Sequence, residues 1–430
     1  MFALILATVS LFPVATSVPP AVIQQKPDTL LQALFPEPTG QNGLEDYLRA
    51  IDLMNDGVSE VYSGGSGYVN RYEADELKAA KAKLADQLKP LDYLANRKAL
   101  GDRYGEAYDL IVQGNQKPCI TPPPSDIAPK GFPSTVRVAE LVQARAYGLS
   151  AEGKESESLE TLLNGLTFTL RSGSTNYVAY LSDVLAERKL FDELLDQLPR
   201  LSLMDAQRLE AYANEAVNQP PLAADLIRRG EKVHEIMFSK GTAGQALTGG
   251  NPGDFPEYRK LLANATQAQL DAFSQGVKDA ETDSYRVQEG ALLQPESQWY
   301  DASGSWKTAF ALKDPLPSDS IADLAKSFSR VITTSYRNLV LTELRRRAQM
   351  RLLGLHARVL EYRWHNHRLP AGMKDIADDR TAFDPLSGES FVYEPHPDGT
   401  YRLFSKGRKE TGVVELHYVG KPSDSLESAP

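Results

Sequence analysis

Cysteine is nearly missing from this chain of 430 residues, in which Cys119 stands alone. A disulfide within the chain is therefore excluded, and so are metal sites of the Cys-x-x-Cys kind. Histidine is scarce as well, with six residues, and the patterns HExxH, GxSxG and the phosphate-binding loop do not occur. From these absences we predict no catalytic constellation, no bound cofactor and no metal.

An excess of basic residues is also missing. Lys and Arg total 47 against 57 Asp and Glu, which gives a formal net charge of −10. Proteins that bind nucleic acids need a clustered basic surface to contact phosphates. The one basic cluster, Arg345 to Arg347 with Arg351, is local. Nucleic acid is therefore excluded as a partner.

An unbroken apolar run long enough to cross a membrane is the third absence. Residues 2–12 are uncharged and mostly apolar, but Pro13 ends this run and small residues follow it. A membrane-spanning helix needs about 20 apolar residues, whereas a shorter run followed by small residues is typical of a secretory signal peptide. We predict that residues 1–22 are a signal peptide, or a membrane anchor through residues 2–22. The protein is then extracytoplasmic, either periplasmic or membrane-anchored; a buried N-terminal helix is the alternative.

Helical periodicity dominates the middle of the chain. A first helix is expected to begin near Asn42, and from 134 to 230 leucines recur at spacings of three and four. Breaks between helices are predicted at a few glycines and prolines, namely Gly153, Gly173, Pro199 and Pro220. The fold class predicted is mainly α, with an irregular array of helical hairpins over residues 42–318.

The period of the apolar residues changes near the C-terminus. Residues 320–365 carry an apolar stripe typical of one long amphipathic helix, which ends before Pro370. Two short strands, 391–393 and 401–404, flank an Asp-Gly turn and form an antiparallel hairpin. We predict a small α+β element over residues 319–418, in which the helix packs on the hairpin, and a disordered tail over 419–430.

This C-terminal segment, residues 335–412, resembles the globular end of type II secretion major pseudopilins. The residues that match the pattern of that family are Asn366, Arg368, Pro370, Asp384, Pro385, Gly388, Tyr393, Tyr401, Leu403, Ser405 and Gly407. The acidic calcium loop of the family has no counterpart, because Arg408 and Lys409 stand in its place. The rest of the chain is similar to uncharacterised exported bacterial helical proteins, which implies no activity.

Two histidines lie close together where the long helix ends, in the stretch EYRWHNHRLP. Residues two apart on a helix point about 200° from each other, so His365 and His367 cannot share a metal from helical backbone. We interpret this stretch as a helix stop, with Asn366 or His367 at the C-cap.

The alternative is a metal or carboxylate site. Its candidate ligands are His365 and His367 together with four aspartates that are close in sequence, namely Asp375, Asp378, Asp379 and Asp384. The simpler interpretation of these aspartates is that they are solvated surface groups.

Two functional hypotheses follow from these patterns. The first is a non-catalytic exported helical protein that serves as a scaffold or interaction module, with protein partners in the cell envelope. The second is an extracytoplasmic hydrolase with a dispersed carboxylate or metal site. A cleft in which acids or histidines converge would favour the hydrolase.

Overall fold

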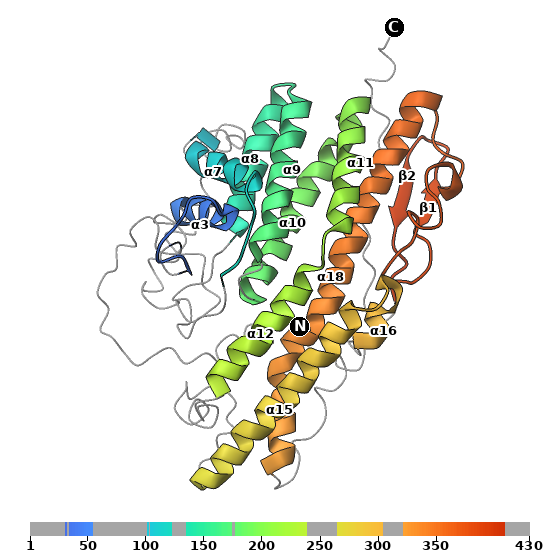
Figure 1. Ribbon diagram of the computed structural model, residues 1–430. Coiled ribbons are helices and arrows are strands. Elements are labelled where there is room, and N and C mark those ends of the chain that lie inside the picture. Colours follow the sequence, from blue (N-terminus) through green and yellow to red (C-terminus); the bar gives the residue numbers. More distant parts are fainter. Residues whose placement is uncertain are drawn as a thin grey trace, which may run out of the picture.

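The computed structural model describes residues 31, 34–54, 101–102, 104–122, 135–173, 177–238, 265–303 and 321–408. These residues are mainly helical and end in a two-stranded antiparallel hairpin (Figure 1), so the predicted fold class is confirmed. The predicted signal segment and the C-terminal tail lie outside the described residues. None of the described helices combines the length and the apolar character that a membrane crossing demands.

The described helices fall into two groups along the chain. The first holds α3 (Gly43–Met54), α7 (Gly105–Asn115), α8 (Val136–Ala151), α9 (Glu155–Ser172) and α10 (Tyr177–Gln197). The second holds α11 (Leu203–Asn218), α12 (Leu222–Phe238), α15 (Gln267–Leu292), α16 (Trp299–Ser303) and α18 (Ile321–Asn366). Single 3₁₀ turns occur at η3 (Leu198–Arg200), η4 (Glu296–Gln298) and η6 (Met373–Asp375), and the strands are β1 (Val392–Pro395) and β2 (Tyr401–Phe404).

The ends of these helices follow the punctuation of the sequence. Gly153 takes a φ of 74°, which few other residues adopt, and separates α8 from α9. The side chain of Ser202 accepts the amide of Asp205 and caps α11, while Thr266 and Gln269 form a capping box at the start of α15. The breaks between α8 and α12 therefore lie at the glycines and prolines where the sequence predicted them.

Every other helix of the second group packs against α18. This helix is 46 residues long and packs against α11, α12, α15 and α16, as its orange ribbon shows in Figure 1. The predicted stripe is buried at Leu344, Ala348, Leu352, Leu355 and Val359. Many residues between these positions are buried too, so the helix is enclosed on more than one side.

The hairpin covers only a part of this helix. Strands β1 and β2 pair antiparallel, with Tyr393 opposite Leu403, and Phe391, Tyr401 and Leu403 are buried. The buried ring nitrogen Nδ1 of His356 on α18 lies 3.0 Å from the hydroxyl of Tyr401. The helix and the hairpin therefore pack as predicted, but α11 and α15 are the main partners of the helix.

At the other end of the molecule, helices α3 and α7 cross without space for a side chain. A Cβ atom added at Gly114 would lie 2.5 Å from Cε1 of Tyr47 and 2.9 Å from the carbonyl oxygen of Gly43. Tyr47 is fully buried, and its ring packs edge-on against Phe168 of α9 at 5.0 Å between centroids. Only glycine therefore fits at position 114.

We predict that Gly114→Ala lowers the free energy of unfolding by about 1–3 kcal/mol, because the added methyl group overpacks this crossing. Gly148→Ala is the matched control, since Gly148 lies within helix α8 and a Cβ atom added there would meet nothing within 4 Å. That control should raise stability by about 0.5–1 kcal/mol through helix propensity. Chemical denaturation measures both, and equal effects of the two variants would contradict the close crossing.

Candidate functional site

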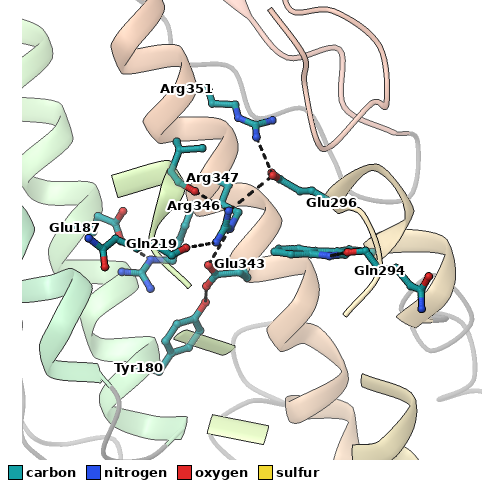
Figure 2. Close-up of polar contacts among 11 residues, drawn as sticks. Tyr180, Glu187, Gln219, Gln294, Glu296, Glu343, Arg346, Arg347 and Arg351 are labelled. Carbon is teal, nitrogen blue, oxygen red and sulfur yellow. Dashed lines mark hydrogen bonds and ion pairs between the residues drawn. The ribbon is translucent and has the colours of Figure 1, made fainter. Parts of the chain in front are cut away.

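Three arginines of helix α18 are buried or half-buried and form the arginine row of Figure 2, namely Arg346, Arg347 and Arg351. Successive residues on a helix point about 100° apart, so the neighbours Arg346 and Arg347 face different partners. Glu187 and Glu296, the acids that they contact, lie on opposite sides of α18. Arg351 is one turn beyond Arg347 and faces the same acid.

Arg346 and Glu187 form an ion pair inside the protein. The distance from Nε of Arg346 to Oε2 of Glu187 is 2.6 Å, and only 4% and 1% of these side chains are exposed. Arg346 also donates to the carbonyl oxygen of Thr169 and lies over the ring of Tyr180, 5.2 Å from its centroid. Helix α18 is thereby tied to α9 and α10.

The surroundings of this pair shift the pKa values of its members. Burial tends to lower the pKa of Arg346, but Glu187, Tyr180 and Glu343 outweigh this effect and raise it. Burial raises the pKa of the Glu187 carboxyl, and the positive charge of Arg346 opposes that shift. The guanidinium therefore stays protonated, and Glu187 is its counter-ion.

Asp183 lies one turn before Glu187 on α10 and is fully buried. Both of its carboxyl oxygens lie 3.0 Å from the hydroxyl of Ser172. Burial raises the pKa of Asp183 to about 8, although hydrogen bonds from Thr135 and Ser172 and the charge of Arg346 act to lower it. At neutral pH this carboxyl is therefore mostly protonated, and a substrate in solvent could reach it only if the helices separated.

Arg347 and Arg351 hold the opposite side of α18. Their guanidinium nitrogens lie 3.7 and 2.7 Å from Oε2 of Glu296, at the start of η4. Arg347 also donates to the carbonyl oxygens of Val217 and Gln219, where α11 ends, at 2.8 and 2.7 Å. These contacts join two separate segments of the chain, η4 and the end of α11, to one helix, so the charges have a structural role.

A shallow depression of about 300 Å³ lies between α11, the end of α18 and η6. The residues that line it are Glu210, Arg358, Glu361, Tyr362, His365, Asn366, Asp375 and Ile376. Two of the candidates from the sequence, His365 and Asp375, are therefore brought together here. Two acids that the sequence patterns did not single out, Glu210 and Glu361, lie beside them.

The other candidate ligands do not join this depression, and most have local structural roles. Oδ1 of Asp378 accepts the amide of Thr381 at 2.8 Å, and Asp379 is exposed. Oδ2 of Asp375 itself accepts the amides of Ala371 and Gly372. Across the described part of the chain, no group of three or more His, Cys, Asp or Glu residues is placed to hold a metal ion.

The expectation that Asp384 is a solvated surface acid was wrong, because Asp384 is fully buried. Its Oδ1 accepts the amide of Leu386 at 2.9 Å, and its Oδ2 accepts the hydroxyl of Ser405 at 2.6 Å. A buried carboxylate is tolerated when hydrogen bonds satisfy its oxygens. Asp384 therefore fixes the turn before the hairpin.

The stretch EYRWHNHRLP is a helix stop, as predicted. Helix α18 ends at Asn366, and His367 takes a φ of 52° in the left-handed region. The amide of His367 donates to the carbonyl oxygen of Arg363 at 2.8 Å, which closes the last turn. His367 thus ends the helix and does not line the depression with His365.

Part of the lining of this depression could have been predicted from the sequence. Arg358, Glu361 and His365 are three and four residues apart on one helix, which places them on one face. Glu210 lies on α11, and no local pattern links it to these residues. Comparisons with protein-family models, with curated protein sequences and with solved structures found no match to this chain.

We predict that Arg346→Met lowers the free energy of unfolding by about 3–5 kcal/mol, because it leaves the buried Glu187 carboxylate without a counter-ion. The double variant Arg346→Met with Glu187→Leu should recover most of this loss. Lys406→Met is the control, since Lys406 pairs with Glu389 where both side chains are largely exposed. The control should change stability by less than about 0.5 kcal/mol; a loss as small in Arg346→Met would show that the pair does not hold the helices.

A second prediction concerns the helix stop. His367→Gly should raise the free energy of unfolding by about 1 kcal/mol, since glycine adopts a positive φ without steric cost. His365→Ala, two residues away in the helix, should leave stability nearly unchanged. Adding zinc should not raise the unfolding temperature. A zinc-dependent rise that is lost when His365 and His367 are both replaced by Ala would instead support the metal site.

Proposed function

We propose that this protein is a non-catalytic scaffold or interaction module of the bacterial cell envelope. The observation that carries the proposal is that the buried charges of α18 join this helix to its neighbours. Arg346 joins α18 to α10, and Arg347 and Arg351 join it to the η4 segment. Such a chain is built to hold a long helix in place, which is what a scaffold requires.

The C-terminal element supports a more specific form of this proposal, a likeness to the globular end of pseudopilins. A long helix stops before Pro370, and an antiparallel hairpin follows it. In place of the acidic calcium loop of that family, Nε of Arg408 donates to the carbonyl oxygen of Leu386 at 3.0 Å. The same guanidinium of Arg408 also pairs with Asp301. A positively charged side chain therefore holds the segment that follows the hairpin.

A hydrolase that acts through carboxylates is the second candidate, and the depression favours it. Glu210, Glu361, His365 and Asp375 all line this feature. Two of these acids are already engaged, however, since Arg358 pairs with Glu210 at 2.7 Å and backbone amides bind Asp375. The scaffold therefore has the stronger support.

The export that this function requires can be tested in the apolar run of residues 2–12. The tagged full chain, expressed in a bacterium and fractionated, should leave the cytoplasm. Leu6→Arg should retain it there, because a charge within the run opposes insertion. Gln24→Arg adds the same charge outside the run and should leave export unchanged. Intact protein in the cytosol, with residues 1–22 still attached, would contradict export.

The scaffold and the hydrolase can be separated in the same cells. Crosslinking of intact cells should place the chain in a larger envelope assembly, and Glu361→Gln should leave that assembly in place. The hydrolase candidate predicts instead that the purified protein cleaves members of a panel of ester, peptide and glycoside substrates, and that Glu361→Gln abolishes the cleavage. Cleavage that depends on Glu361, with no assembly in cells, would replace the scaffold proposal.

A further inference from the structure

The end of helix α18 meets two other elements through one side chain. Nε and Nη2 of Arg358 contact Oε1 of Glu210 on α11, at 2.8 and 2.7 Å. Nη1 of Arg358 donates to the carbonyl oxygen of Ile376, directly after η6, at 3.0 Å. Arg358 thus joins α11, α18 and the segment that leads to the hairpin.

Glu361 lies next to this junction, one turn further along α18. Its Oε1 is shielded from solvent and has no hydrogen-bond donor, and Glu361 lines the same depression as Glu210. Two carboxylates cannot donate to each other, so a hydrogen bond between these two acids needs a proton on one of them. The other charged or titratable groups that line the depression are Arg358, Tyr362 and His365 on α18 and Asp375 on η6.

We propose that Glu361 holds a proton where it faces the depression beside Glu210, and that loss of this proton loosens the junction of α11, α18 and η6. Burial, together with the neighbouring acid, raises the pKa of Glu361 to about 7, while Arg358 and Gln207 act in the opposite direction. Above that pH two negative charges face each other, with Arg358 as their common counter-ion. The junction is then a pH-sensitive joint between the helical body and the C-terminal element.

The direction of the pH dependence follows from this shift. The ordinary pKa of Glu is 4.5, and the folded value is raised to about 7. The contribution to stability is therefore complete below pH 4.5 and is lost as the pH rises through about 7. A glutamine at position 361 imitates the protonated acid, so it should remove this dependence.

Thermal unfolding of the full chain between pH 4.5 and 8.5 tests the proposal. The unfolding temperature of Glu361→Gln should match the wild type at low pH and exceed it by about 2–4 °C at pH 8. Glu215→Gln is the control, because Glu215 is exposed on the same helix α11; its difference from the wild type should not vary with pH. A difference for Glu361→Gln that is constant across this range would overturn the proposal.

Hydrogen exchange gives a local readout that needs no variant. The amides of Ile376 and Ala377 donate to the carbonyl oxygen of Met373, so their exchange reports opening of the η6 turn. After correction for the intrinsic effect of pH, their protection in the wild type should fall several-fold between pH 5.5 and 8, and Glu361→Gln should keep it. Protection that does not change with pH in the wild type would refute the joint, whether or not the variant folds.

Discussion

The burial of Arg346 against Glu187 is the constraint on which the packing of α18 against the first helical group depends. A charge inside a protein is tolerated only with a partner at short range and with its remaining donors satisfied. Helix α10 supplies the partner because Tyr180, Asp183 and Glu187 are three and four residues apart and share one face. Helix α18 can therefore lie in the interior only in the register that brings Arg346 to this face.

The remaining arginines extend the same principle outward. Arg347 and Arg351 bind backbone carbonyl oxygens of other segments, namely that of Gln219 directly after α11 and that of Phe383 between η6 and β1. Carbonyls at such ends have no partner within their own helix or strand. The guanidinium groups satisfy them and at the same time position the neighbouring segments. Helix α18 therefore organises the fold through polar contacts as much as through its apolar stripe.

The sequence was sufficient to predict the regular parts of this fold. Its glycines and prolines marked the helix breaks, and the change of period located the long helix and the hairpin. It could not show that the arginine row is buried, because Glu187 is 159 residues from Arg346 and no local pattern connects them. For the same reason Asp384 was expected in solvent: its partner Ser405 lies on another segment, 21 residues away.

Two carboxyls with a raised pKa, Glu361 and Asp183, lie at different depths in the molecule. Glu361 is half-buried near the end of α18, whereas Asp183 is fully buried on α10. Both carboxyls have a raised pKa, so both contributions to stability fall as the pH rises. As the pH rises, the C-terminal element should open before the helices around Arg346 separate, since local openings precede global unfolding where the contacts are weaker.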